Sequence, residues 1–417
     1  MPETDLESRR AAFPLGAAVT TAQLAGNPHP VLRQLRESEP VSWLPSLGGW
    51  LVTPAGIADD VLHDEHTFTV DDPRFTTARV VGPSMLSLDG EAHRRHRDPF
   101  ARALRAAPTR TRLASAVAAH VARLVADVAA HDGAAELRRG LAGPLAVAVM
   151  AEMLGLDVGP GQLLAWYDAI VAGVSALAEA APRADPHADP RADPRAGSGG
   201  NAGKAVPPAA AAAFAELSTC VETALGRSDA QSVLTAAADL TVSEVVSNAA
   251  VLLFGGIETT EGMICNAIWY LLHDEAALAH VLADGSLTEG AVEEALRLEP
   301  AAAVVDRYAT ADVSLGTAAV RRGDLVTVSI AAANRDPAVF GEPDRFDLRR
   351  PNGRQHLAFA SGPHFCIGAQ LARLEATAAL RALLDNLPGV RLDPALPSAP
   401  SGLVFRKPPS LHVRWDR

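Results

Sequence analysis

One cysteine lies in a segment whose residue order permits few folds. Residues 359–368 read Phe-Ala-Ser-Gly-Pro-His-Phe-Cys-Ile-Gly, so Cys366 occupies a turn shaped by glycine and proline. Apolar residues then recur on one helical face at spacings of four, three and four, at Ile367, Leu371, Leu374 and Ala378. A cysteine at the start of a helix meets backbone N–H groups and the positive end of the helix dipole, which favour the thiolate, a nucleophile and a ligand of soft metals.

A lone cysteine in a large protein is more often a small buried apolar residue, so the surrounding spacing must carry the argument. The pattern Phe-x-x-Gly-x-His-x-Cys-x-Gly, filled by Phe359, Gly362, His364, Cys366 and Gly368, resembles the haem-ligand signature of the cytochrome P-450 family. The resemblance implies a haem b cofactor with Cys366 as the thiolate ligand of its iron. It also implies that His364 binds a haem propionate and that Phe359 and Gly368 contact the cofactor. We expect Gly362 and Gly368 to let a flat cofactor lie against the backbone.

The length and composition of the chain limit the classes of protein to which it can belong. A chain of 417 residues with 48% hydrophobic residues can form one large or two ordinary domains, and its net charge of −12 argues against nucleic acid as the main partner. Its three cysteines are odd in number and far apart, which indicates neither a disulfide framework nor a zinc module. Residues 1–10 are polar, without a signal-peptide pattern, and the apolar run 140–151 is too short to cross a bilayer. We therefore expect a soluble, cytoplasmic protein.

Hydrophobic periodicity predicts a helix-rich α+β chain with small sheets and no long internal repeat. Residues 1–30 are expected to form an extended lead-in, and residues 71–88 are expected to be irregular. Helices are expected at 30–36, 54–63, from 89 onward, and at 112–128, 141–154, 162–180, 209–225 and 241–272. A β-hairpin is expected at 41–53, and short strands are expected between 304 and 328 and at 390–392, 403–405 and 411–415.

One segment departs from this globular pattern. Residues 183–194 repeat Arg-Ala-Asp-Pro, His-Ala-Asp-Pro and Arg-Ala-Asp-Pro, and a Gly-Ser-Gly-Gly run follows at 197–200. A proline at every fourth position forbids a regular helix, and glycine and serine add flexibility. We expect residues 182–208 to be a flexible insertion within a single domain that spans residues 1–417 and, by the resemblance, has the cytochrome P-450 fold.

The helix expected at 241–272 carries an unusual polar group of residues. Gly255 and Gly256 each cost about 1 kcal/mol in a helix interior. Glu258 and Thr259 follow them in an otherwise apolar stretch, where buried polar groups need partners or a task. A helix kink, with the threonine bonded to a carbonyl of its own helix, would explain the pattern. The resemblance implies instead a groove in which Gly255 and Gly256 face the haem, Thr259 bonds dioxygen and Glu258 relays protons.

Further residues match the family's pattern in the expected order. His93 and Arg97 are four apart on the helix that begins near Asp89, so they share one face. A solvated basic face would explain them, but the resemblance implies that His93, Arg97 and Arg307 bind haem propionates. It also implies that Glu294 and Arg297 form a structural ion pair, which Arg345 completes.

Apolar residues near these motifs are expected to line a substrate pocket for a lipophilic small molecule. They are Val80, Val81, Met85, Leu86, Ala250, Val251, Phe254, Ala302, Ala303, Val304, Leu403 and Val404. Lipophilic specialised metabolites such as polyketides, terpenoids and steroids fit this description equally well.

The resemblance implies a monooxygenase that activates dioxygen to hydroxylate or otherwise oxidise its substrate. Electrons would come from a separate ferredoxin or flavodoxin, with docking arginines flanking the cysteine loop, and the protein would act as a monomer. Two other classes remain open: a haem-thiolate sensor without turnover, and a cysteine hydrolase that uses Cys366 and His364.

Overall fold

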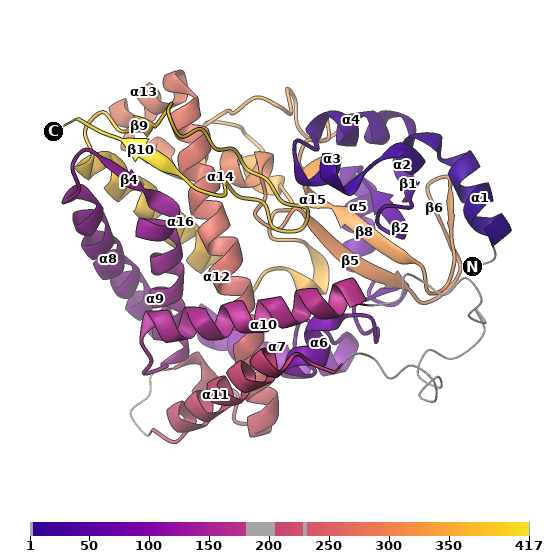
Figure 1. The fold of residues 1–417 in the computed structure, drawn as a ribbon, viewed down its shortest axis with the longest axis horizontal. Coiled ribbons are helices and arrows are strands. Elements are labelled where there is room, and N and C mark those ends of the chain that lie inside the picture. The colour runs from indigo at the N-terminus through magenta and orange to yellow at the C-terminus, as the bar shows by residue number, and fades with distance from the viewer. Residues whose placement is uncertain (1–2, 181–204, 228–231, 417) are drawn as a thin grey trace.

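The computed structural model describes residues 3–180, 205–227 and 232–416 (Figure 1). The proline-rich repeat at 183–194 and most of the expected insertion at 182–208 lie outside these described residues. The helical half of the protein surrounds one long central helix, α12 (Figure 1). Its helices are α7 Gly90–Arg105, α8 Ala107–Ala129, η1 Arg138–Ala142, α9 Gly143–Leu154, α10 Pro160–Ala180, α11 Pro208–Leu225, η2 Val233–Ala236, α12 Val242–His273, α13 Glu275–Ala283, η3 Gly285–Leu287, α14 Thr288–Leu298 and α16 Ala369–Asn386.

The other half contains a five-stranded sheet of order β1-β2-β8-β5-β3, in which β2 and β8 are parallel and the other pairs antiparallel. Its strands are β1 Val41–Leu44, β2 Gly49–Val52, β8 Leu325–Ser329, β5 Val304–Ala309 and β3 Phe68–Thr69. Smaller sheets pair β4 Ala134–Glu136 with β10 His412–Arg414 and β9 Arg391–Leu392, and β6 Val313–Leu315 with β7 Ala318–Val320. The remaining helices are α1 Glu3–Ala12, α2 Pro14–Ala18, α3 Thr21–Ala25, α4 His29–Ser38, α5 Ala55–His63, α6 Thr76–Val81, α15 Ile330–Ala333, η4 Gly353–Gln355 and η5 Gly362–His364.

The central helix α12 begins where the sequence predicts. Thr241 and Glu244 form a reciprocal capping box at its N-terminus. The helix is long and apolar enough by composition to cross a membrane, but 56% of its most apolar window is buried inside the protein. It contacts α9, α14 and α16, and its residues contribute to both large hydrophobic clusters. This burial identifies α12 as a core helix.

Two predicted irregular regions contain helices. Residues 3–25 form α1, α2 and α3 instead of an extended lead-in, and residues 76–81 form α6. Helices this short are marginal in isolation, so packing stabilises them, as where Arg9 of α1 stacks over the ring of Trp43 at 4.5 Å. The tail differs as well, since residues 403–405 form no strand and only an isolated bridge joins Phe405 to Ala302.

Candidate functional site

Cys366 lies in a loop that a backbone hydrogen bond closes. Its N–H donates to the Phe359 carbonyl over 2.9 Å, and η5 lies between the two residues. Gly362 has a φ of +69°, and a Cβ at this position would lie 2.5 Å from the carbonyl oxygen of Leu62. Only glycine fits there, because it tolerates both the conformation and the close approach. Packing against α5 therefore accounts for Gly362, rather than the expected room for a flat cofactor.

The sulfur of Cys366 faces the start of α16, as the sequence predicts. Gly368 is the N-cap of that helix, and a Cβ added to it would lie 4.0 Å from Sγ. Burial raises the pKa of the Cys366 thiol, and this outweighs the lowering by the Gly368 N–H and by Arg97. A metal cation at the sulfur supplies the kind of charge that holds a buried thiol deprotonated.

The two glycines of α12 differ in their surroundings. A Cβ on Gly256 would lie 2.2 Å from the sulfur of Met150, so this glycine lets α9 and α12 pack closely. A Cβ on Gly255 would meet no heavy atom within 4 Å, so open space adjoins the helix there. The hydroxyl of Thr259 donates to the carbonyl of Gly255, which is the back-bonded arrangement expected of a kinked helix.

Glu258 belongs to a charged network that sequence reasoning did not find. Its carboxylate accepts a hydrogen bond from the Tyr167 hydroxyl at 2.7 Å and lies 2.7 Å from the ammonium nitrogen of Lys407. Lys407 is also 3.4 Å from Glu261, which pairs with Arg138. Burial alone would raise the pKa of Glu258, but Lys407 and Tyr167 outweigh it, so the pKa is lowered and the group is an anion at neutral pH.

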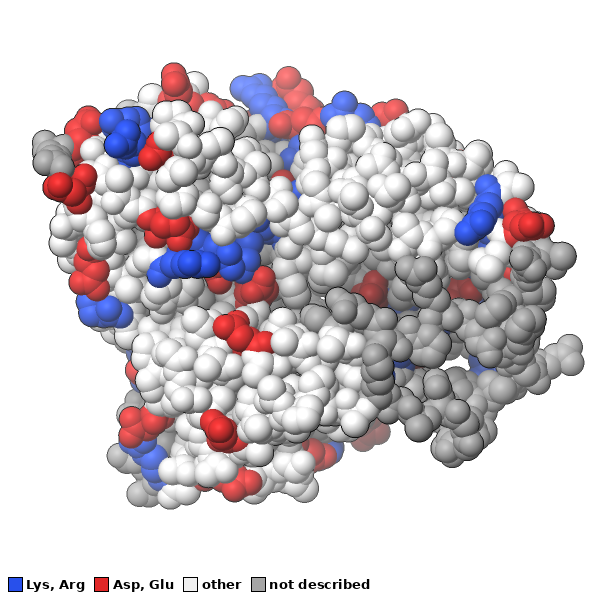
Figure 2. All heavy atoms as spheres, in the orientation of Figure 1, with Lys and Arg blue, Asp and Glu red and all other residues white. Residues whose placement is uncertain are grey.

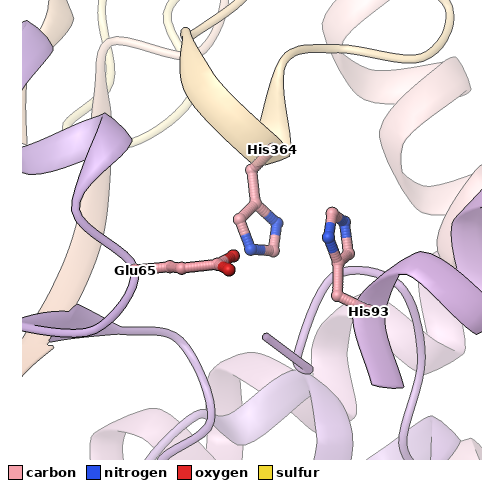
Figure 3. A group of neighbouring side chains, drawn as sticks. All are labelled: Glu65, His93 and His364. Carbon is pink, nitrogen blue, oxygen red and sulfur yellow. The ribbon is translucent and has the colours of Figure 1, made fainter. Parts of the chain in front are cut away.

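A second cluster of polar side chains lies beside the cysteine loop (Figure 3). His93 of α7 and His364 of the loop stack with ring centroids 4.2 Å apart, and Nε2 of His364 lies 2.8 Å from Oδ1 of Asp89. Glu65 points at the same place (Figure 3). Burial, and then His364 and Arg97, lower the pKa of His93 to about 4, so its ring is neutral. Among the described residues, Nε2 of His93 has no hydrogen-bond partner.

Two arginines near this cluster also lack a carboxylate partner. Arg307 is 6% exposed, and neither it nor Arg97 forms an ion pair with any residue that the structure describes. Within the described ranges, the Arg97 side chain donates only to the carbonyl of Phe365, which adjoins Cys366. Arg307 is buried and Arg97 is half-buried, and cations that lose water without gaining a counterion call for an anion. The ligand atoms of Glu65, His93 and His364 lie within 4.8 Å of one another and could hold a metal ion, but the two arginines and the unpartnered Nε2 of His93, which can donate a hydrogen bond, fit the carboxylates of a porphyrin better.

Comparisons with known proteins agree with this arrangement. A sequence model of cytochrome P450 matches residues 225–409. The chain is 33% identical to the cytochrome P450 monooxygenase PikC of Streptomyces venezuelae, over 94% of this chain and 92% of that protein. The chain belongs to the cytochrome P450 family. It is also 32% identical to mycinamicin IV hydroxylase/epoxidase of Micromonospora griseorubida, over 92% of this chain and 94% of that protein. The structure of cytochrome P450 CYP109Q5 from Chondromyces apiculatus covers 96% of this chain and matches with a TM-score of 0.80 at 27% identity over 97% of its own length.

Membership of the cytochrome P450 family makes this protein an oxidoreductase with a haem cofactor and confirms the predicted fold. Within that fold, the ion pair predicted for Glu294 and Arg297 is present and buried. Arg297 is 0% exposed and donates to both carboxylate oxygens of Glu294, at 2.7 and 2.8 Å. It also donates to the carbonyls of Asn334, Pro343 and Arg345, at 3.0, 2.6 and 2.9 Å.

The third member of this P450 ion-pair group is Arg350, and the prediction of Arg345 was wrong. Nε of Arg350 lies 3.0 Å from both oxygens of Glu294, and its side chain is 6% exposed. The side chain of Arg345 is 63% exposed and pairs with Glu342. The chain turns between the two arginines, so Arg345 contributes its carbonyl and Arg350 its guanidinium.

The residues predicted to line one substrate pocket lie in several different places in this P450. Ala250 and Phe254 line a cavity of about 10 Å³ with Tyr167. Four others, Ala303, Val304, Leu403 and Val404, line a separate cavity of about 130 Å³. The other predicted residues line neither of these two cavities. Ala302 forms the bridge to Phe405, and the rest belong to or contact one hydrophobic cluster: Val80, Val81, Met85, Leu86 and Val251. Phe405 links the two regions because its ring contacts that of Phe254, with centroids 5.7 Å apart.

The ion-pair group gives a prediction that distinguishes the two arginines. Arg350→Met leaves part of the buried charge of Glu294 uncompensated and is expected to lower the free energy of unfolding by about 1–3 kcal/mol. Arg345→Met keeps the backbone carbonyl that Arg297 uses and is expected to change stability by less than about 0.5 kcal/mol. Urea denaturation of the haem-loaded variants measures both. Equal losses for the two variants would contradict the assignment of Arg350.

Proposed function

We propose that this cytochrome P450 is a monooxygenase that oxidises a lipophilic small molecule in specialised metabolism. The observation that carries the proposal is the set of unpaired cationic and donor groups, Arg97, Arg307 and His93, beside the loop of Cys366. These groups suit a porphyrin acid next to a thiolate ligand. The similarity to mycinamicin IV hydroxylase/epoxidase supports hydroxylation and epoxidation as reaction types. We also propose that the enzyme is a cytoplasmic monomer; the burial of α12 supports only the interpretation of that helix as part of the core and not as a membrane span.

We assign the cofactor as haem b, held through Cys366, with His93, Arg97, Arg307 and His364 toward its propionates and Phe359, Gly255, Gly256 and Gly368 beside the ring. Haem bound through a cysteine thiolate supplies dioxygen activation. Of the two glycines in α12, only Gly255 adjoins open space, so we expect Gly255 to lie closer to the ring.

The haem assignment predicts a spectrum. Reduced wild-type protein with carbon monoxide is expected to show the red-shifted Soret band of thiolate-ligated haem. Cys366→Ala is expected to lose that band because alanine offers no ligand, whereas Cys265→Ala, which changes a fully buried cysteine of the core helix α12, is expected to keep it. Extraction into alkaline pyridine identifies the haem type. A thiolate band that survives in Cys366→Ala would exclude the assignment.

Two residues of α12 are assigned to proton delivery. The Glu258 carboxylate is anionic and lies between Lys407 and Tyr167, which hold it in position, and we propose that it accepts a proton from water and passes it on. The Thr259 hydroxyl lies one turn from Gly255 and the open space beside it, and we propose that it leaves the Gly255 carbonyl to hand a proton into that space. Lys407 acts through Glu258, so it is a positioning residue.

Proton delivery predicts uncoupling rather than loss of binding. Thr259→Ala is expected to raise the hydrogen peroxide released per electron pair several-fold, because the hydroxyl that hands on the proton is gone. The adjacent Thr260→Val, a buried change of equal volume, is expected to leave this ratio unchanged. Peroxide and product are measured together during turnover. A haem-thiolate sensor, the alternative function, would show no substrate-dependent turnover and no difference between these variants.

We propose that electrons come from a separate acidic ferredoxin or flavodoxin. The exposed arginines on α7, α8 and the 349–354 segment are candidates for its docking surface: Arg102, Arg105, Arg110, Arg349 and Arg354. Arg97 joins α7 to the cysteine loop through the Phe365 carbonyl, which brings the first of these elements near the ligand loop. Arg350, also expected on this surface, is committed to Glu294 and buried, so it is left out.

Charge reversal tests the docking surface. A variant with Arg102→Glu, Arg105→Glu and Arg110→Glu is expected to slow reductase-coupled turnover at least about tenfold at low salt and to weaken its salt dependence. A control variant with Arg10→Glu and Arg391→Glu reverses two exposed arginines that do not belong to the candidate docking surface, and it is expected to behave like wild type. Unchanged salt dependence in the triple variant would contradict this surface. Turnover driven by added peroxide separates docking from chemistry.

A further inference from the structure

A mostly buried cation lies against the cysteine loop, on the helix that begins just after it. The side chain of Arg373 in α16 is 17% exposed, and the carbon of its guanidinium lies 4.5 Å from the centre of the Phe359 ring. The carbonyl of Phe359 in turn accepts the backbone hydrogen bond of Cys366 over 2.9 Å. A cation over the face of an aromatic ring is attracted to it, so this contact holds the guanidinium against the loop.

One buried carboxylate fixes the position of this guanidinium. Glu293 of α14 accepts hydrogen bonds from Nε and Nη2 of Arg373, at 2.6 and 3.1 Å, in a bidentate pair. Nε2 of the buried His356 lies 3.0 Å from the same carboxylate. Because Nδ1 of His356 accepts from the Ala358 N–H at 3.2 Å, the ring has its proton on Nε2 and donates to Glu293. Glu293 is therefore oriented by one partner and bound by the other.

The charge of Arg373 reaches the sulfur of Cys366. Burial raises the pKa of the Cys366 thiol, and the N–H of Gly368 is the largest opposing influence. The charges of Arg97 and Arg373 then lower this pKa further. Glu293 is not among these leading influences. Arg373 is therefore the member of its ion pair that acts on the sulfur.

The two arginines differ in what surrounds them. Arg97 belongs to the group assigned to the haem propionates, and the negative charge of a propionate would offset it. The side chain of Arg373 is mostly enclosed by protein, so water screens its charge less than that of an exposed arginine. On the face shown in Figure 2, by contrast, basic and acidic residues lie side by side in contact with solvent. Arg373 is thus the cation whose field on the sulfur persists once the propionate group is filled.

We propose that Arg373, placed by Glu293, raises the reduction potential of the haem iron that Cys366 binds. The proposal rests on the haem assignment made above. Reduction adds one electron, from the ferredoxin or flavodoxin, to the iron–thiolate unit; no bond forms or breaks, no proton is transferred, and the net charge of the unit falls by one. A nearby cation stabilises the more negative state. Within the described residues the Arg373 side chain makes no hydrogen bond to Cys366, so Arg373 is a positioning residue that acts through its field.

Redox titration of the haem-loaded protein with dithionite and mediators, followed by absorption, tests the proposal. Arg373→Met removes the charge and is expected to lower the equilibrium constant for one-electron reduction about tenfold, which is about 59 mV. Glu293→Gln leaves Arg373 without its counterion and is expected to raise that constant about threefold. Arg381→Met, which removes an exposed arginine from the same helix, is expected to leave it unchanged. A purely structural role of the ion pair would not give opposite shifts in the first two variants.

A double variant keeps the test decisive if a single variant does not fold. Each single change leaves a buried charge unpaired, whereas Arg373→Met combined with Glu293→Gln removes both charges together. This double variant is expected to have a reduction constant below that of wild type, because the removed cation is the charge that acts on the sulfur. A wild-type constant in Arg373→Met or in the double variant, or shifts of the same sign in the two single variants, would overturn the proposal. The carbon monoxide band is read in each sample, and its absence from wild-type protein would instead contradict the haem assignment.

Discussion

The buried charge of Arg297 is the constraint on which the rest of the structure depends. A guanidinium with no exposed surface is tolerated only if every donor is used, and here Glu294 and three loop carbonyls use them. Those carbonyls belong to residues 334–345, which lead into the cysteine loop. The cost of leaving the charge unpaired therefore fixes the chain that approaches Cys366. The sulfur of Cys366, which we propose as the haem ligand, is thus positioned by a group that makes no hydrogen bond to it.

The central helix α12 meets two opposing demands, because it must be apolar to cross the core and, in the function we propose, polar to move protons. Close packing of Gly256 on Met150 sets the distance between α9 and α12, and the neighbouring Gly255 leaves space on another side. Glu258 is kept ionised inside the protein by Lys407, which comes from the far end of the chain. The ion pair with Lys407 thus gives Glu258 the stabilisation that water gives a carboxylate on the surface.

Short sequence patterns predict much of the fold and part of the candidate site, whereas contacts between residues far apart in the sequence are not predicted. The Thr241 capping box and the cysteine pattern are short-range, and both elements occur where the sequence places them. Lys407 could not be assigned, because its partner lies 149 residues away and no spacing links them. The resemblance indicates Arg345, but the arginine that reaches Glu294 depends on which way the loop turns, and sequence order does not reveal that. The helix α3 was missed although Thr20 and Gln23 form a capping box that could have revealed it.

The strand β5 shows how one short element serves two environments. Alternation sends Arg307 toward the histidine cluster and Asp306 to the opposite face, where it is exposed and borders the cavity of about 130 Å³. Because the side-chain period is two, a shift of one residue in register would exchange the two charges, placing a carboxylate toward the cofactor acids and a guanidinium in an apolar cavity. The pairing of β5 with β8, from Val304 to Tyr308, excludes that shift. The same backbone hydrogen bonds therefore determine the sign of the charge on each face.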